Sequence, residues 1–326
     1  MSGIIIAGLC SLALTVLSGV LFIPVLRKVK AGQPILKYVK EHEQKSGTPT
    51  MGGLFFILPL AAVFFAFGGG NTRIATVSVL VGLFYMLVGF LDDFLKIKLK
   101  HNEGLKPYQK IVFQTAIAFL CGVFAYTNGL TVLYLPFVKR SAEIGLWIIP
   151  IVAAVFIALT NSVNLTDGMD GLCGGVSESY LLSVAALILL ERNFGGSYLK
   201  NVETDGIILL ISVTTFAVMG FLVFNVPKAK VFMGDTGSLG LGGLLGAVSV
   251  FSGNTLFIPL IGFAFVWSSL SVIIQVAHFK RTRKRVFLMA PFHHHLQMKG
   301  FTETQISFYY SMITVIIGLV TVIFYL

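Results

Sequence analysis

The segment IIIAGLCSLALTVLSGVLFIPVL, residues 4–26, decides the fold class because its 23 consecutive positions carry no charged side chain. A helix needs about 20 predominantly apolar residues to cross the hydrocarbon core of a bilayer. The run is long for the core of a signal peptide and has no clear cleavage site. We therefore expect it to persist as a first membrane span.

Nine similar apolar runs follow along the 326 residues. The ten predicted spans are residues 4–26, 52–67, 74–91, 111–126, 144–159, 171–190, 206–224, 238–251, 256–279 and 306–326. The runs are continuously apolar, whereas a membrane β-barrel would alternate polar and apolar residues. The sequence thus predicts an all-α, polytopic integral membrane protein of ten transmembrane helices, forming one domain over residues 1–326. Outside the spans, the β-branched segment 127–143 favours a small hairpin.

The composition excludes several other classes of protein. Hydrophobic residues make up 56% of the chain and charged residues 12%, with a mean hydropathy of +0.89, whereas soluble domains carry about 25% charged residues. An ordinary soluble enzyme, a disordered tail and a secreted disulfide scaffold are all excluded. Cys10, Cys121 and Cys173 have no metal-ligand spacing and are expected to be free, packed thiols.

The net charge of +10 has a strongly one-sided distribution. The loops 27–51, 92–110, 160–170, 225–237 and 280–305 together hold 19 of the 24 Lys and Arg residues. Basic residues concentrate in cytoplasmic loops, so we expect these loops to face the cytoplasm and both termini to face outward. No basic groove interleaved with aromatic residues is present, and no nucleic-acid partner is predicted.

Five polar phrases lie in these loops or at their membrane edge. They are KSGTPTMGG (45–53), LDDF (91–94), NSVNLTDGMDG (161–171), NVPKAKVFMGDTGS (225–238) and APFHHHL (290–296). Carboxylates, amides, histidines, lysines and glycines gathered on one side of a membrane suit a phosphate-rich substrate, a divalent cation and a partner embedded in the bilayer. We therefore expect a catalytic or binding site there.

Each phrase also has a simpler interpretation. Asp92 and Asp93 could be a solvated interfacial pair, with Asp92 bridged to Lys96 one turn later. Asp235 or Ser238 could cap a helix. The remaining phrases could be a loop of turn formers, a Gly/Pro helix entry and a zinc-binding tract. The glycines at 234 and 237 favour close approach of a ligand over capping alone.

In this order and at these spacings, GTPTMGG, LDD, NLTDGMDGL, FMGDTGSL and PFHHH resemble the phospho-N-acetylmuramoyl-pentapeptide-transferase (MraY) family. This family belongs to the polyprenyl-phosphate N-acetylhexosamine-1-phosphate transferases. The resemblance implies transfer of phospho-MurNAc-pentapeptide from UDP-MurNAc-pentapeptide to undecaprenyl phosphate, giving lipid I and UMP. It also implies a need for Mg²⁺, a homodimer and a bacterial plasma-membrane location with a cytoplasmic active site.

The resemblance carries residue roles onto this chain. It implies that Asp92 and Asp93 form a catalytic pair, that Asp235 is the Mg²⁺ ligand and that His294 belongs to a required histidine motif. The implied substrate-binding residues are Lys45, Thr50, Asn164, Asp167, Gly168, Met169, Asp170, Asn225, Phe232, His293 and His295. One departure is visible: the family commonly has Glu where this chain has Gln297.

Alternatives remain open at this point. A UDP-GlcNAc:undecaprenyl-phosphate GlcNAc-1-phosphate transferase would share the fold. A UbiA-type prenyltransferase would require a third carboxylate where Lys96 stands. A transporter would place ionisable residues in mid-span, where Glu178 is the clear example. For the transferase, either an Asp attacks to form a covalent intermediate, or it removes a proton from the lipid phosphate, which attacks directly. We favour the direct route.

Overall fold

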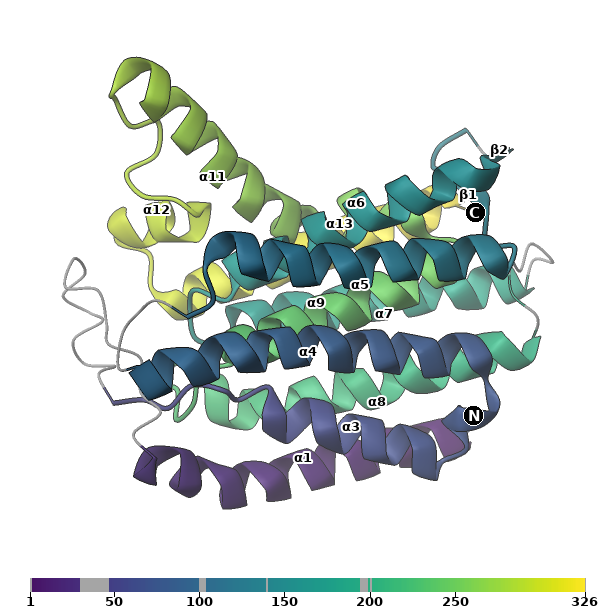
Figure 1. Ribbon diagram of the computed structural model, residues 1–326, viewed down its shortest axis with the longest axis horizontal. Coiled ribbons are helices and arrows are strands. Elements are labelled where there is room, and N and C mark those ends of the chain that lie inside the picture. Colours follow the sequence, from purple (N-terminus) through teal and green to yellow (C-terminus); the bar gives the residue numbers. More distant parts are fainter. Residues whose placement is uncertain are drawn as a thin grey trace.

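The computed structural model describes residues 2–29, 47–99, 104–138, 140–193, 199 and 201–325. Most of the helices lie side by side in a bundle with their axes roughly aligned (Figure 1). The main helices are α1 (Ser2–Lys28), α3 (Leu54–Ala66), α4 (Arg73–Leu99), α5 (Pro107–Thr127), α6 (Ile148–Thr166), α7 (Leu172–Asn193), α8 (Asn201–Asn225), α9 (Gly234–Phe251), α10 (Ile258–Ile261), α11 (Phe263–Thr282), α12 (Phe292–Met298) and α13 (Glu303–Tyr325). Short 3₁₀ turns, η1 (Gly69–Asn71), η2 (Gly145–Trp147) and η3 (Thr255–Phe257), precede α4, α6 and α10.

The all-α, polytopic prediction is confirmed for the described residues. Eight of their helices are long and apolar enough to cross a membrane: α1, α4, α5, α6 with its preceding turn, α7, α8, α11 and α13. The other two predicted spans coincide with α3, which has 13 residues, and α9, which has 18. The count of ten crossings stays a prediction.

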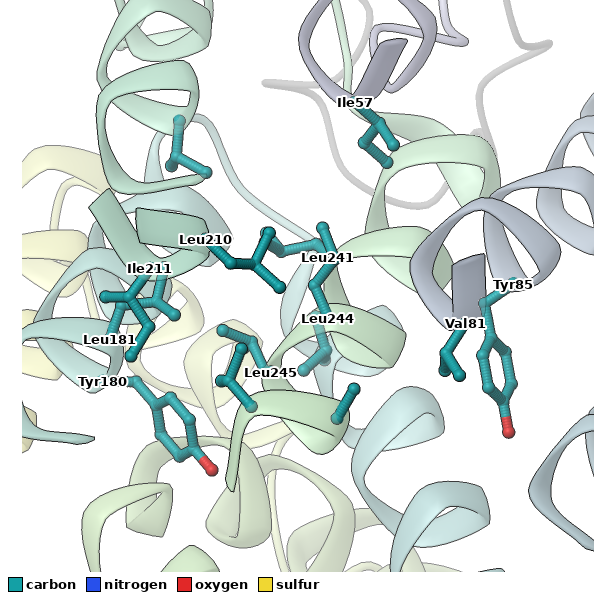
Figure 2. Close-up of a cluster of buried hydrophobic side chains, with 14 of the residues drawn as sticks. Ile57, Val81, Tyr85, Tyr180, Leu181, Leu210, Ile211, Leu241, Leu244 and Leu245 are labelled. Atoms are coloured by element: carbon teal, nitrogen blue, oxygen red, sulfur yellow. The ribbon is translucent and has the colours of Figure 1, made fainter. Parts of the chain in front are cut away.

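Helix α9 lies at the centre of the bundle because its side chains are small. Every residue from Thr236 to Phe251 is buried, and the helix packs against α4 and α6. Its glycines let neighbouring helices approach closely: a Cβ on Gly242 would lie 2.8 Å from the Thr160 Cα. Figure 2 shows Leu241, Leu244 and Leu245 of this helix among the surrounding core side chains.

One predicted span is divided in the structure. We expected a single helix over residues 256–279, but η3 and α10 precede a break at Gly262, and α11 begins at Phe263. Pro259 lies in the first turn of α10, where proline is tolerated, and Gly262 ends that helix, so the helix is interrupted although the sequence stays apolar. Beyond the break, α11 leaves the bundle, and α12 packs beside it (Figure 1).

The predicted hairpin is confirmed. Strand β1 (Val132–Leu135) pairs antiparallel with β2 (Arg140–Glu143), and Val132 lies opposite Glu143. Both chain ends lie at the hairpin end of the bundle, whereas α4 ends and α12 lies at the other (Figure 1). The two termini thus lie at the same end of the bundle, and the outward direction of that end stays a prediction.

Candidate active site

Three carboxylates from two helices meet at the end of the bundle away from the termini. Asp92 and Asp93 lie near the end of α4 and are 3% and 0% exposed, and Asp235 lies in the first turn of α9. One carboxylate oxygen from each lies within 4.8 Å of the others. Such a spacing allows three carboxylates to share one divalent cation. The alternative of a solvated interfacial pair is therefore wrong for Asp92 and Asp93.

Close packing of α4 on α9 brings these carboxylates together. A Cβ on Gly89 would lie 2.0 Å from the Asp235 backbone oxygen, so only glycine permits this approach. Gly234 has a positive φ of 69°, and a Cβ there would lie 2.6 Å from Asp93 Oδ2. Two glycines thus create the space in which Asp93 and Asp235 face one another.

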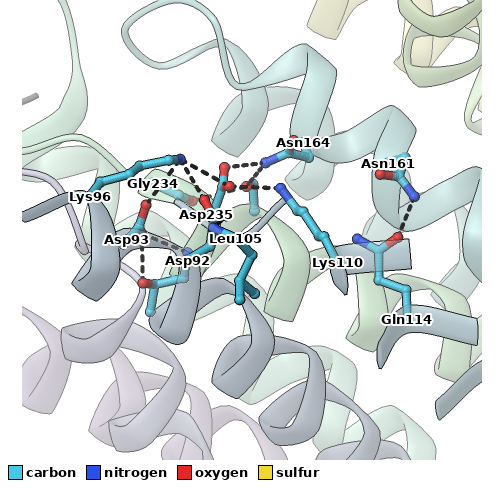
Figure 3. Close-up of polar contacts among 12 residues, drawn as sticks. Asp92, Asp93, Lys96, Leu105, Lys110, Gln114, Asn161, Asn164, Gly234 and Asp235 are labelled. Atoms are coloured by element: carbon cyan, nitrogen blue, oxygen red, sulfur yellow. Dashed lines mark hydrogen bonds and ion pairs between the residues drawn. The ribbon is translucent and has the colours of Figure 1, made fainter. Parts of the chain in front are cut away.

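Two lysines neutralise part of this negative charge (Figure 3). Lys96 Nζ lies 2.6 Å from Asp92 Oδ2, 3.8 Å from Asp93 Oδ1 and 3.2 Å from Asp235 Oδ2. Lys110, from α5, places its Nζ 2.7 Å from the same Asp235 oxygen. The predicted bridge between Asp92 and Lys96 is present, and Lys96 also reaches both other carboxylates.

Asp235 is held on both of its oxygens. Asn164 of α6 donates from Nδ2 to Asp235 Oδ1 at 2.7 Å and to Ser238 Oγ at 2.8 Å. Burial by itself raises the pKa of the Asp235 carboxyl, but a hydrogen bond with Asp92 and the positive charges of Lys110 and Lys96 outweigh it. Together they hold that pKa well below its ordinary value. The Asp235 carboxylate is therefore held in place and ionised, and its oxygens are suited to coordinating a cation.

Asp92 and Asp93 each accept a hydrogen bond from a backbone N–H, and Asp93 also accepts one from a hydroxyl. The Thr236 N–H and hydroxyl both donate to Asp93 Oδ2, at 2.9 and 2.7 Å. Asp93 Oδ1 is buried and accepts no hydrogen bond from the described residues. Leu105 N–H donates to Asp92 Oδ1 at 2.9 Å, which ties the segment after α4 to the cluster. The Asp93 oxygen without a donor is the strongest sign that the cluster receives a cation.

The predicted substrate residue Thr50 also lies at the cluster. Phe232 N–H donates to the Pro49 carbonyl at 2.8 Å, and Gly52 N–H donates to the Phe232 carbonyl at 2.9 Å. This backbone pairing places Thr50 Oγ1 2.4 Å from the position of a Cβ on Gly234. The GTPTMGG and FMGDTGS phrases therefore form one wall of the site.

Gly237 has a different role from the one expected. A Cβ at Gly53 would lie 2.3 Å from the Gly237 nitrogen, so the two glycines are packed against each other and leave no space for a ligand between them. Helix α9 begins with no side-chain capping hydrogen bond. The capping alternative for Asp235 and Ser238 is therefore wrong.

The predicted segment 161–171 divides into two parts. Asn161 and Asn164 lie on α6, which continues to Thr166, whereas Asp167 and Asp170 follow in a turn. Burial raises the pKa of Asp167, the carboxylates of Asp235, Asp93 and Asp170 raise it further, and a hydrogen bond from the Gly234 N–H opposes the rise. Asp167 therefore lies within the electrostatic field of the cluster.

Other predicted substrate residues hold the loops together. Asp170 Oδ2 accepts from the Ala229 N–H at 3.1 Å. Asn225 accepts from the Gly171 N–H at 3.1 Å and donates to the Val231 carbonyl at 2.9 Å. Both side chains are buried. In this structure they fix the 167–171 and 226–233 segments against each other.

Two of the three histidines pack on one turn, and the third points away from it. A Cβ on Gly168 would lie 2.4 Å from His293 Nε2 and 3.2 Å from His294 Nε2, so both rings pack on the 167–171 turn. His294 Nδ1 pairs with Gln297 Oε1 at 3.2 Å. His295 Nδ1 instead accepts from the Leu288 N–H at 3.1 Å, within the connection before α12. His295 is directed away from His293 and His294, which argues against a zinc ion shared by all three.

The structure therefore brings most of the predicted site residues to one place. Asp92, Asp93, Asp235, Asn164, Asp167, Gly168, Thr50, His293 and His294 surround the cluster or the turn beside it. Met169 is buried and Phe232 half-buried. Lys45 lies outside the described residues. The sequence did not indicate that Lys96 contacts Asp235. Its position one helical turn after Asp92 and Asp93 was a signal that could have placed it in the site.

Comparisons with known proteins agree with this arrangement. The family model for glycosyl transferase family 4 matches residues 75–253, and the first phospho-N-acetylmuramoyl-pentapeptide-transferase signature matches residues 45–57. The phospho-N-acetylmuramoyl-pentapeptide-transferase of Clostridioides difficile is 41% identical, with 97% of this chain and 95% of that protein covered. The chain belongs to the phospho-N-acetylmuramoyl-pentapeptide-transferase family.

Two other family members match over similar lengths. The enzyme of Desulfitobacterium hafniense is 36% identical over 99% of this chain and 98% of its own length. The enzyme of a Thermoanaerobacter species is 39% identical, with 96% of both chains covered. The glycosyl transferase match includes the three clustered carboxylates, and the signature match includes Thr50. The chain is thus a transferase of this family and a multi-pass membrane protein.

Proposed function

We propose that the chain transfers phospho-MurNAc-pentapeptide from UDP-MurNAc-pentapeptide to undecaprenyl phosphate, giving lipid I and UMP. This is the first membrane step of peptidoglycan synthesis. The observation that carries the proposal is near-full-length identity of 36–41% to named transferases of this reaction. The carboxylate cluster supplies the chemistry that such a reaction requires.

We propose Mg²⁺ as the cation of the cluster, with Asp235 as its principal ligand and Asp92 and Asp93 beside it. The fit rests on three carboxylates within 4.8 Å and on a buried Asp93 oxygen without a donor. Oxygen-only ligands are those that Mg²⁺ prefers. A bound Mg²⁺ would offset repulsion between the anionic reactants and stabilise the departing UMP.

The protein side chains orient the phosphate groups of the two substrates and remove a proton from the lipid phosphate. Lys96 and Lys110 supply positive charge beside the place where two phosphate groups must meet. In the direct route, Asp92 or Asp93 removes a proton from undecaprenyl phosphate. A phosphate oxygen of the lipid then bonds to the sugar-linked phosphorus, and the bond to UMP breaks. Detection of a phospho-sugar adduct on either aspartate would support the covalent route instead.

We further propose that ten helices cross the membrane, that both termini face outward and that the carboxylate cluster faces the cytoplasm of a bacterial cell. The excess of Lys and Arg in the loops at the cluster end supports this orientation. A nucleotide-linked substrate made in the cytoplasm would reach a site placed there. We also propose a homodimer, as the family resemblance implies.

The test is UMP release by the purified protein in detergent, with undecaprenyl phosphate and Mg²⁺. UDP-MurNAc-pentapeptide and UDP-GlcNAc are supplied in parallel. We expect release from the first nucleotide sugar alone, abolished by EDTA. Release from UDP-GlcNAc alone would assign the chain to the related GlcNAc-1-phosphate transfer. Release from neither, with well-folded protein, would contradict the enzymatic proposal.

A further inference from the structure

One helical turn away from the cluster, a pair of amide side chains joins α5 and α6, the two helices whose Lys110 and Asn164 contact Asp235. Asn161 Nδ2 of α6 donates to Gln114 Oε1 of α5 at 2.7 Å (Figure 3). Gln114 is fully buried, and Asn161 is half-buried. A polar pair at an apolar helix interface holds the two helices in one register, because sliding would leave the amides unpaired.

The pair is aligned with the active-site contacts. Gln114 lies one turn after Lys110 on α5, and Asn161 lies one turn before Asn164 on α6. Lys110 contacts Asp235 Oδ2, and Asn164 contacts Asp235 Oδ1, each at 2.7 Å. Residues one helical turn apart share a face. The distance between the two helices at the amide pair thus sets the distance between the two groups that hold Asp235.

Gln114 is also tied to the helix that carries the other carboxylates. The Tyr85 hydroxyl of α4 donates to the backbone carbonyl of Gln114 at 3.1 Å. The Tyr85 ring is stacked on Phe156 of α6, with ring centres 6.1 Å apart. Gln114 Nε2 has no hydrogen-bond partner among the described residues. Burial of an unpaired amide nitrogen is unfavourable, so apolar packing alone does not account for a glutamine at this position.

We propose that Gln114 and Asn161 form an amide clamp of positioning residues, which holds Lys110 and Asn164 on opposite oxygens of Asp235. The proposal rests on the proposed transferase function. The clamp touches no reacting group itself. It acts by keeping a charge and a hydrogen-bond donor where transition-state charge develops, and small displacements of such groups reduce turnover strongly.

The decisive variants keep an amide at both positions and change only the length of the side chain that carries it. Gln114→Asn shortens one side by a methylene group and breaks the contact. The double variant Gln114→Asn with Asn161→Gln restores the combined length. We expect about a 10-fold loss of kcat in the single variant, with KM for both substrates within about 3-fold. In the double variant we expect recovery to within about 3-fold of wild type.

Tyr180→Phe is the matched control, because it removes another buried hydrogen bond, between the Tyr180 hydroxyl and Ser249 Oγ at 2.7 Å. We expect it to lower the unfolding temperature and to leave kcat unchanged. Equal losses of kcat in Gln114→Asn and Tyr180→Phe, or no recovery in a folded double variant, would overturn the clamp. If Gln114→Asn fails to fold, Asn161→Ala measures the same loss at a half-buried position, and full turnover there would also overturn it.

A second readout is independent of turnover. The Mg²⁺ concentration that gives half of the maximal rise in unfolding temperature is measured for each variant. We expect it to increase several-fold in Gln114→Asn and to return in the double variant. An unchanged value in all variants would contradict the clamp. If Gln114→Asn and the double variant show these shifts but the wild-type protein releases no UMP, the proposed function is contradicted and the positioning of Asp235 by the clamp is supported.

Discussion

Asp235 shows how a single residue acquires its properties from its surroundings. Its carboxylate contacts Lys96, Lys110 and Asn164, each from a different helix. A hydrogen bond with Asp92 and the positive charges of Lys110 and Lys96 outweigh the cost of desolvation and hold the pKa of this carboxyl well below its ordinary value. The side chain is therefore suited to holding a cation, the role that the family resemblance implies for it.

Asp235→Asn tests this role. The amide keeps the size of the side chain but removes the charge, so we expect loss of UMP release by at least about 100-fold. The control is Arg73→Ala, at the far end of α4, which should leave turnover unchanged. Wild-type turnover in Asp235→Asn would overturn the metal assignment.

His293 should make stability depend on pH. Burial, and secondarily the neighbouring His294, lower the pKa of His293 well below its ordinary value of 6.5. Below pH 6.5 the unfolded chain therefore binds a proton that the native protein does not, and the unfolding free energy should fall as pH decreases.

The measurement is the unfolding temperature in detergent between pH 8 and pH 5, compared for wild type and His293→Gln. We expect a smaller fall in the variant. His278→Gln, which removes an exposed imidazole, is the control and should follow wild type. An identical fall in wild type and His293→Gln would contradict the prediction.

At the scale of elements, the approach of α4 to α9 depends on residues without side chains. Gly89 lies against the Asp235 backbone, which cannot move aside, whereas Gly82 lies against the Leu244 side chain, which can rotate. The two glycines occupy the same helix, two turns apart. Substitutions at Gly89 and Gly82 therefore distinguish the effect of packing at the active site from the effect of packing elsewhere on the same helix.

We expect Gly89→Ala to abolish turnover and to lower the unfolding temperature. Gly82→Ala should lower the unfolding temperature, because overpacking a core costs about 1–3 kcal/mol, yet keep turnover within about 3-fold. UMP release and thermal unfolding of both variants check this. Normal turnover in Gly89→Ala would show that the spacing of α4 and α9 is not critical.

At the scale of the whole molecule, the two ends of the bundle differ. The carboxylate cluster lies at one end, and the hairpin with both termini lies at the other (Figure 1). Many side chains between the ends are apolar and exposed, such as Leu120 at 66% and Ile323 at 67%. Lipid rather than water suits this surface.

Cysteine labelling of intact cells tests the proposed orientation in the membrane. In a variant without Cys10, Cys121 and Cys173, a single cysteine replaces Lys284 or Arg140. We expect a membrane-impermeant maleimide to label Arg140→Cys in intact cells, and Lys284→Cys only after the cells are opened. The reverse pattern would place the carboxylate cluster outside and contradict the orientation.

The sequence by itself determined the fold class, most helix positions, the hairpin and the family. Apolar runs and their lengths are local features, and helices in lipid satisfy their own backbone hydrogen bonds, so each run predicts its own structure. The five polar phrases likewise identified most residues that the structure brings together. The break at Gly262 was missed because the run around it stays apolar.

Only the tertiary structure decided which groups face one another. The contacts of Lys96 and Lys110 with Asp235, the backbone pairing of residues 49–53 with 232–233, and the Gln114–Asn161 clamp all join distant parts of the chain. No periodicity in one segment encodes such contacts. They depend on how closely glycine-lined helices pack, and this packing also turns His293 and His294 toward Gly168 while His295 faces away.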